Sequence, residues 1–168
     1  MSPNGKRKVS SFDSLTRRNI RFAKATWPNE ISSLMLCELR TLSLKSGMDR
    51  SLGEILLLNG RWYVTSVGLL HIAKDRRCRG IHTRAIEKLS DPGAHCWVFR
   101  ATVYKTSQSK GFVGYGDADP FNTSPLVRGA EMRVAETRAV NRALRKAYGI
   151  GLCSIGRAET HGRTDFVL

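Results

Sequence analysis

Acidic residues are scarce in this sequence. The 168 residues include 14 Asp and Glu against 28 Lys and Arg, which leaves a formal net charge of +14. A field of that sign and size attracts polyanions, which are nucleic acids or acidic membrane surfaces. Long apolar runs are also lacking, because runs such as 55–58 fall far short of the roughly 20 residues that a membrane-spanning helix needs. We therefore expect a nucleic-acid partner and no membrane span.

Paired cysteines and nucleotide-binding motifs are missing as well. The four cysteines lie far apart and form no C-x-x-C pair, so a disulfide framework is not indicated. The chain has no G-x-x-x-x-G-K-[ST] phosphate loop, so ATP is not an expected cofactor. No apolar segment follows the basic residues at 6–8, so we expect no secretory signal. These features predict a protein that works without a cofactor or a metal.

The remaining composition is that of a folded protein. Hydrophobic residues make up 41% of the chain and charged residues 25%, which are ordinary values for a globular domain. Residues 1–30 carry seven basic side chains and few aliphatic ones, so we expect a basic, flexible arm there. We expect one domain over 31–155 and a short C-terminal tail over 156–168.

The first half of that domain predicts a helix, a hairpin and a second helix. Apolar residues recur at three- and four-residue steps over 31–44, which predicts an amphipathic helix that ends near Gly47. Residues 54–58 and 61–65 flank Asn59-Gly60, a dipeptide typical of a two-residue hairpin turn. A short helix is expected over 67–77.

The second half predicts a three-stranded meander and a long helix. Short polar connections separate three strand-like runs, at 80–89, 96–106 and 110–115. In the middle run, apolar side chains alternate with a mixed and basic set that includes Arg100, which predicts one core face. A loop is expected over 117–125, followed by a helix over 125–148 that begins at a proline and ends before Gly149. The fold class is therefore α+β, with a β-β-β-α core preceded by the hairpin and the short helix.

The long helix carries two stripes. At 100° per residue, one arc of roughly 140° is apolar. Another arc of roughly 100° is basic and contains Arg128, Arg138, Arg142, Arg145 and Lys146. A solvated charged face is the ordinary explanation for such a stripe. We favour contact with phosphates, because several arginines in a line match a phosphate backbone and the whole chain is basic.

Residues of the meander are further candidates. Arg84 and Arg100 lie on the strand face opposite the apolar one, where they would border a nucleic-acid groove. Their alternative is an ordinary polar sheet face. Tyr115 is the candidate for stacking on a base, although an aromatic residue at a strand end is more often part of a core. Gly114 and Gly116 predict a close backbone approach or a bend.

Several motifs together resemble the Rad52-type family of single-strand annealing proteins. They are Val113-Gly114-Tyr115-Gly116 at a strand end, Arg142-Ala143-Leu144-Arg145 on a long helix, and the glycine-rich exit 149–153. The resemblance covers roughly residues 60–155. The chain departs from the family at Asn141, where family members can have Lys, and in a helix exit that is one residue longer than in the vertebrate form.

The resemblance implies a Rad52-like fold, assembly into a homo-oligomeric ring, and ATP-independent binding and annealing of single-stranded DNA in recombination or repair. It places Arg142 and Arg145 in the DNA groove. Candidate partners are single-stranded DNA, further copies of the chain, and a recombinase or single-strand binding protein. We expect a non-enzymatic, cytoplasmic protein of bacterial, plasmid or phage origin, with organelle targeting as the alternative because the N-terminus is rich in Arg and Ser.

Two other functions stay open at this point. A double-stranded RNA or DNA binding module would share the charge and the β-β-β-α order, but would not anneal strands. A magnesium-dependent nuclease would use Asp117 and Asp119 together with Glu131 or Glu136 on the long helix. Turn formation is the alternative role for the two aspartates.

Overall fold

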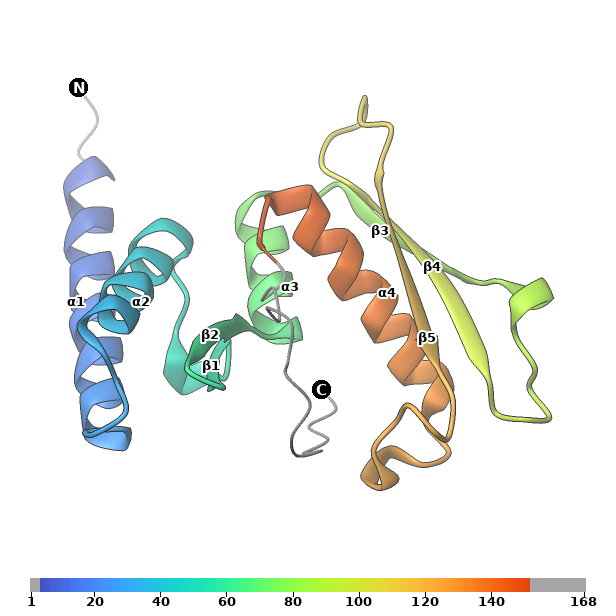
Figure 1. Cartoon of the computed structure of the whole chain (residues 1–168). Helices are drawn as coiled ribbons and strands as arrows, with labels where there is room; N and C mark the ends of the chain where they lie inside the picture. Colours follow the sequence, from blue (N-terminus) through green and yellow to red (C-terminus); the bar gives the residue numbers. More distant parts are fainter. Residues whose placement is uncertain (1–3, 152–168) are drawn as a thin grey trace. The chain divides into compact units, whose positions relative to one another are not determined.

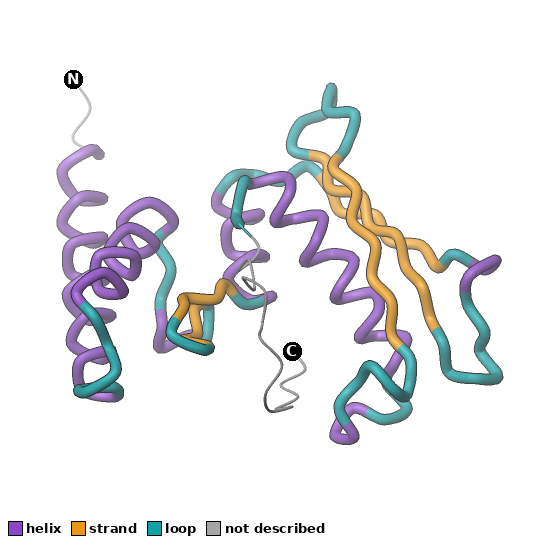
Figure 2. The backbone as a smooth tube through the Cα atoms, in the orientation of Figure 1, coloured by secondary structure: helices purple, strands orange, loops and turns teal. Residues whose placement is uncertain are grey.

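The protein is α+β. The computed structural model describes residues 4–151, with side chains from Phe12 onward, and the chain divides into two compact units at His71 and Ile72. The described residues contain four α-helices and two antiparallel sheets (Figures 1 and 2). The expected tail over 156–168 lies outside the described residues.

A pair of helices begins the first unit. Helix α1 spans Asn4–Thr26 and helix α2 spans Ser33–Ser46. Between them, the buried Asn19 donates from Nδ2 to Ser43 Oγ (2.9 Å) and to the carbonyl oxygen of Met48 (2.8 Å). The α2 helix ends at Gly47, which has the left-handed φ of 63° that favours glycine, as the sequence predicts.

The segment expected to form a flexible arm over residues 1–30 is helical where the structure describes it, as α1. Thr16, Asn19 and Ala23 recur at three- and four-residue steps and are all buried. This face is built from small and polar residues, so it does not register as an apolar stripe in the sequence. Hydrogen bonds such as those of Asn19 replace part of the missing apolar contact.

The expected hairpin follows. Strands β1 (Ile55–Leu58) and β2 (Arg61–Val64) pair in antiparallel register after a short 3₁₀ helix, η1 (Arg50–Leu52). Asn59 and Gly60 both have positive φ, at 48° and 71°, which is the conformation that the two-residue turn requires. Helix α3 (Ser66–Asp75) follows the hairpin and matches the predicted range to within two residues at each end.

The second unit contains the meander. Strands β3 (Gly80–Ala85), β4 (Trp97–Tyr104) and β5 (Phe112–Ala118) form an antiparallel sheet in the order β3-β4-β5. The expected meander is therefore confirmed. Its first strand ends earlier than predicted and is followed by a 3₁₀ helix, η2 (Glu87–Leu89), whereas β5 extends into the predicted loop.

Helix α4 (Glu131–Tyr148) covers one face of this sheet (Figure 1). Its buried alanines lie on two glycines of β5, so that the two backbones nearly touch. A Cβ at Gly116 would lie 2.2 Å from the carbonyl oxygen of Ala135, and one at Gly114 would lie 2.4 Å from the amide nitrogen of Ala143. The expected role of these glycines in close approach is confirmed.

The helix begins later than the sequence predicts. A 3₁₀ helix, η3 (Pro125–Val127), occupies the predicted first turn, and Gly129 with φ of 85° separates it from α4. Pro125 therefore begins a 3₁₀ turn, and Glu131 begins the α-helix, where its Oε1 accepts from the amide of Gly129 (2.9 Å). None of the described helices combines the length and the apolar character that crossing a bilayer requires.

Candidate nucleic-acid interface

Three candidate residues form one row across the face of the sheet that is turned away from α4. Arg84 on β3 lies opposite Arg100 on β4, and Arg100 lies opposite Tyr115 on β5. Their alternation partners Phe99 and Ala101 are buried, so the row belongs to the other face, as predicted. We call Arg84, Arg100 and Tyr115 the sheet row. Its side chains line an open pocket together with residues 85–88.

The sheet row combines positive charge with an aromatic ring. Two like charges directly opposite each other destabilise a strand pair unless an anion lies between them. Arg100 is half-buried, and its Nε is without a hydrogen-bond partner among the described residues. Tyr115 keeps 50% of its surface exposed, so its ring can receive a base. Glu87 lines the same pocket and offsets part of the charge.

A second row runs along the edge of β5. Arg138, Arg142 and Lys146 lie four residues apart on α4 and form one stripe, which we call the cation row. Each donates to a carbonyl oxygen of the edge strand: Arg138 to Asp117 (2.7 Å), Arg142 to Tyr115 (2.7 Å) and Lys146 to Val113 (2.8 Å). Four residues of helix rise about 6 Å and two residues of strand about 6.8 Å, so the two series stay in register.

The cation row explains how the edge of the sheet is covered. An edge strand presents a series of carbonyl groups without strand partners. Here three cationic side chains reach over that edge and donate hydrogen bonds to those carbonyl groups. A guanidinium has five N–H donors, and the hydrogen bonds of Arg142 leave from Nη1 alone, toward Tyr115 and, at 3.3 Å, Asp117 Oδ1. Its side chain is 47% exposed, so further donors face the solvent.

Arg142 connects the two rows. The residue that it contacts through a backbone oxygen, Tyr115, is the same residue whose ring completes the sheet row. The edge of β5 and the open face of the sheet are therefore joined at this contact. The structure brings together six predicted residues in this way: Arg84, Arg100, Tyr115, Arg138, Arg142 and Lys146.

Two predicted residues lie elsewhere. Arg128 is exposed but precedes α4, because the helix begins at Glu131, so it is not part of the basic stripe. Arg145 is only 5% exposed and donates from Nη1 to the carbonyl oxygen of Gly151 (3.2 Å). In this structure Arg145 therefore contacts the exit of the helix and does not lie in the row of Arg138, Arg142 and Lys146.

The two aspartates of the nuclease alternative brace a turn. Asp119 Oδ1 accepts from the amides of Phe121 (2.7 Å) and Asn122 (2.9 Å). The Asn122 side chain donates to Asp117 (3.1 Å) and to Asp119 (2.9 Å). Glu131 is bonded to Gly129, and no group of three or more His, Cys, Asp or Glu side chains in the described part of the chain is arranged to hold a metal ion.

Sequence reasoning missed Asn122. Its Oδ1 accepts from Arg138 Nη1 (2.9 Å), and its backbone oxygen accepts from Arg138 Nη2 (2.8 Å). This residue therefore fixes the first cation of the row and the turn at once. The available signal was an Asn in a proline-containing turn, where its side chain commonly bonds nearby backbone.

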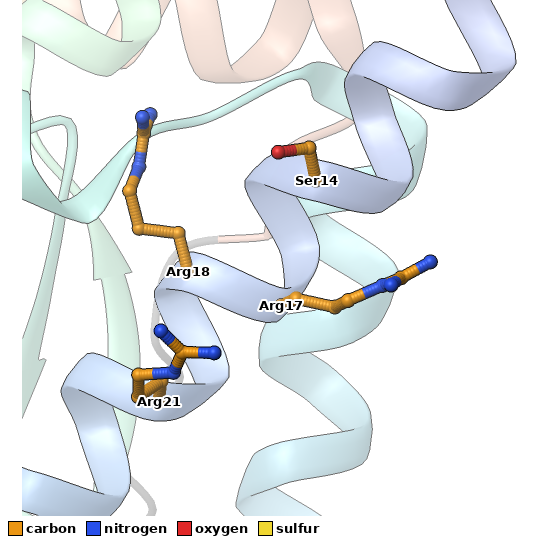
Figure 3. Close-up of a pocket in the computed structure, with 4 residues that line it drawn as sticks. All are labelled: Ser14, Arg17, Arg18 and Arg21. Carbon is orange, nitrogen blue, oxygen red and sulfur yellow. The ribbon is translucent and has the colours of Figure 1, made fainter.

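Another basic surface lies in the first unit. Ser14, Arg17, Arg18 and Arg21 project from α1 and line a pocket (Figure 3). Arg18 pairs with Asp49, and Asp49 also accepts from the amide of Ser51 (2.9 Å). Burial alone would raise the pKa of Asp49, but the hydrogen bonds from Ser51 and the charge of Arg18 outweigh it and lower that pKa.

The fold and the two rows thus define a class: an α+β domain whose sheet carries a helix on one face and a basic, partly aromatic surface on the other. Comparison with known proteins gives no match to a family model, to a curated protein or to a solved structure. The Rad52-type resemblance therefore remains a hypothesis that rests on the sequence motifs.

Proposed function

We propose that the protein binds single-stranded DNA and anneals complementary strands without ATP, as a homo-oligomeric ring acting in recombination or repair. The observation that carries the proposal is the junction at Arg142, where the cation row meets the sheet row. Binding of single strands requires both a track for phosphates and a surface on which bases can stack. The cation row supplies the track for phosphates, and the sheet row supplies the surface for stacking.

The proposed mechanism is positioning rather than bond chemistry. Phosphates lie along Arg138, Arg142 and Lys146, and neutralisation of their charge releases counterions and holds the strand extended. Bases near Tyr115 stack on its ring, and the other bases stay accessible to a complementary strand. Pairing itself then supplies the driving force for annealing. The ring is supported by the family resemblance alone.

A duplex-binding module is the second candidate. It would use the cation row in the same way, because phosphates are common to both substrates. It would have no use for an exposed aromatic ring, since the bases of a duplex are already stacked. The 50% exposure of Tyr115 therefore favours the single-strand proposal.

Strand annealing tests the proposal. Two complementary labelled oligonucleotides are mixed with the protein without nucleotide or magnesium, and pairing is followed by energy transfer. We expect the wild-type protein to accelerate pairing and Arg142→Ala with Tyr115→Ala to abolish the acceleration. Arg133→Ala is the matched control, because Arg133 is an exposed arginine of the same helix outside the cation row.

Salt titration separates the two rows. The slope of log K against log salt should flatten by about 0.7 for each phosphate of a single strand that the protein no longer neutralises, so Arg142→Ala flattens it and Tyr115→Ala does not. Equal affinity of the wild-type protein for duplex and single strand, without accelerated pairing, would support the duplex module instead. Absence of single-strand binding would refute the proposal.

A further inference from the structure

The turn between β5 and α4 holds two large apolar side chains in water. Phe121 is 98% exposed and Leu126 is 95% exposed, the highest values among the large hydrophobic side chains that the structure describes. Single exposed apolar residues are common on protein surfaces. Two of them in one connecting segment, Phe121 in the turn and Leu126 in η3, call for a physical explanation at such exposure.

Flexibility does not explain the exposure, because the turn is firmly braced. The backbone amide of Phe121 donates to Asp119 Oδ1 (2.7 Å), and Thr123 Oγ1 donates to the carbonyl oxygen of Asp119 (2.7 Å). Asn122 contributes the hydrogen bonds to Asp117, Asp119 and Arg138 described above. These hydrogen bonds fix the backbone that carries Phe121, and the ring extends from that fixed backbone into solvent.

The position of the ring follows from Arg138. This side chain is the first member of the cation row and also donates two hydrogen bonds to Asn122, the residue next to Phe121. The turn precedes the first residues of α4 (Figure 1), and Arg138, further along that helix, reaches it through these hydrogen bonds. A strand whose phosphates follow the cation row toward Arg138 therefore arrives at the turn that carries Phe121.

We propose that Phe121 stacks on a base of the bound strand at the Arg138 end of the cation row. This inference rests on the proposed function. Every base has a π face, so a fully exposed phenyl ring binds bases without reading sequence. A second copy of the chain is a poorer occupant of this position, because the turn is hydrogen-bonded to the cationic Arg138, and a local positive charge attracts a polyanion rather than a basic protein surface. Leu126 has no π face and takes no part.

The test measures single-strand affinity by fluorescence anisotropy with a labelled oligonucleotide of mixed sequence. Phe121→Leu keeps an apolar side chain but removes the aromatic ring, and we expect it to weaken binding about 5- to 140-fold. Phe121→Trp should bind at least as tightly as the wild-type protein. Leu126→Ala is the matched control from the same connection between β5 and α4, and its affinity should stay within about twofold of wild type.

An abasic phosphodiester strand of equal length isolates the stacking contribution. Phe121→Leu and the wild-type protein should bind it equally, because the variant keeps every cationic side chain that faces a phosphate, and their salt slopes should agree on both ligands. A 2-aminopurine base placed near the end of the footprint should change its emission with the wild-type protein and not with Phe121→Leu.

The outcomes are distinguishable from failure of the proposed function. If Arg142→Ala weakens binding but Phe121→Leu binds the normal strand like wild type, the stacking inference is overturned and the proposed function stands. If Phe121→Leu changes the mass of the oligomer at unchanged affinity, the ring packs between copies and the inference is also overturned. If the wild-type protein binds no single strand, the proposed function is refuted, and the stacking inference is refuted with it.

Discussion

Gly116 offers the sharpest test of how α4 sits on the sheet. An alanine Cβ at this position would lie 2.2 Å from the carbonyl oxygen of Ala135 and 2.3 Å from the amide nitrogen of Ala139. Both atoms belong to the helix backbone, so no side-chain rotation can relieve the clash. Restoring ordinary contact at about 3.4 Å requires the helix to move by about 1 Å, which a close-packed interior resists.

The expected cost of Gly116→Ala is about 1–3 kcal/mol of unfolding free energy, the usual range for an overpacked core. The shift would also lengthen the hydrogen bonds that the cation row donates to β5, because those side chains start from the displaced helix. Gly80→Ala is the matched control: it lies in the same sheet, and its Cβ would come no closer than 3.8 Å to a neighbouring atom. A strand alanine is intrinsically more favourable than glycine, so the control should be neutral or slightly stabilising.

Urea unfolding followed by circular dichroism gives the free energies. Hydrogen exchange of peptides from β5 and α4 shows whether the destabilisation belongs to the second unit, which matters because a chain of two units need not unfold in one step. If Gly116→Ala unfolds at the same urea concentration as Gly80→Ala, and the amides of β5 exchange equally slowly in both variants, the close approach of helix and sheet is refuted.

Three further predictions concern buried or bracing groups. Arg145→Ala should lower the urea midpoint clearly, because it removes a buried, hydrogen-bonded charge, whereas Arg142→Ala should shift the midpoint little and act mainly on binding; equal midpoints would contradict this. Asp49→Asn should destabilise the protein at pH 7, because folding lowers the pKa of Asp49. The contribution of its carboxylate to the free energy of unfolding is complete above about pH 3.8 and disappears as the pH falls through the folded pKa. The gap between the urea midpoints of wild type and variant should therefore shrink as the pH falls below 3.8, and a gap of constant size would count against this prediction. Asn122→Ala removes the brace of the turn, so chymotrypsin should cleave after Phe121 about ten times faster or more, and an unchanged cleavage rate would show that the brace is not needed.

The sequence predicted much of the second unit because its signals are local. The alternation along β4 and the glycine after α4 each depend on neighbouring residues, as does the turn at Asn59-Gly60 in the first unit, and the structure confirms all three. The later start of α4 was not predicted. Pro125 is equally favourable at the start of a 3₁₀ turn, and only the left-handed conformation of Gly129 reveals the break.

Part of the candidate site could not be predicted because it depends on contacts between distant segments. The angular arc placed Arg145 beside Arg142, but Arg145 is buried and donates to the carbonyl oxygen of Gly151, a contact with the segment after the helix that the arc does not contain. Asn122 was missed because its role requires Arg138, which lies 16 residues further along the chain. The docking of α1 was missed because its buried face is polar.

The same contacts that cover the edge of β5 also prepare the cation row for a ligand. An unrestrained arginine side chain gives up conformational entropy when it binds a phosphate, and this cost weakens binding. Arg142 is already held by its Nη1 hydrogen bond to Tyr115, so its side chain loses much of that conformational entropy on folding rather than on binding. It follows that Arg142→Lys, although it keeps the charge, should bind single strands more weakly than wild type: an ammonium that bonds the Tyr115 oxygen has no second, fixed nitrogen to present to a phosphate. Wild-type affinity in Arg142→Lys would show that the row acts only through its net charge.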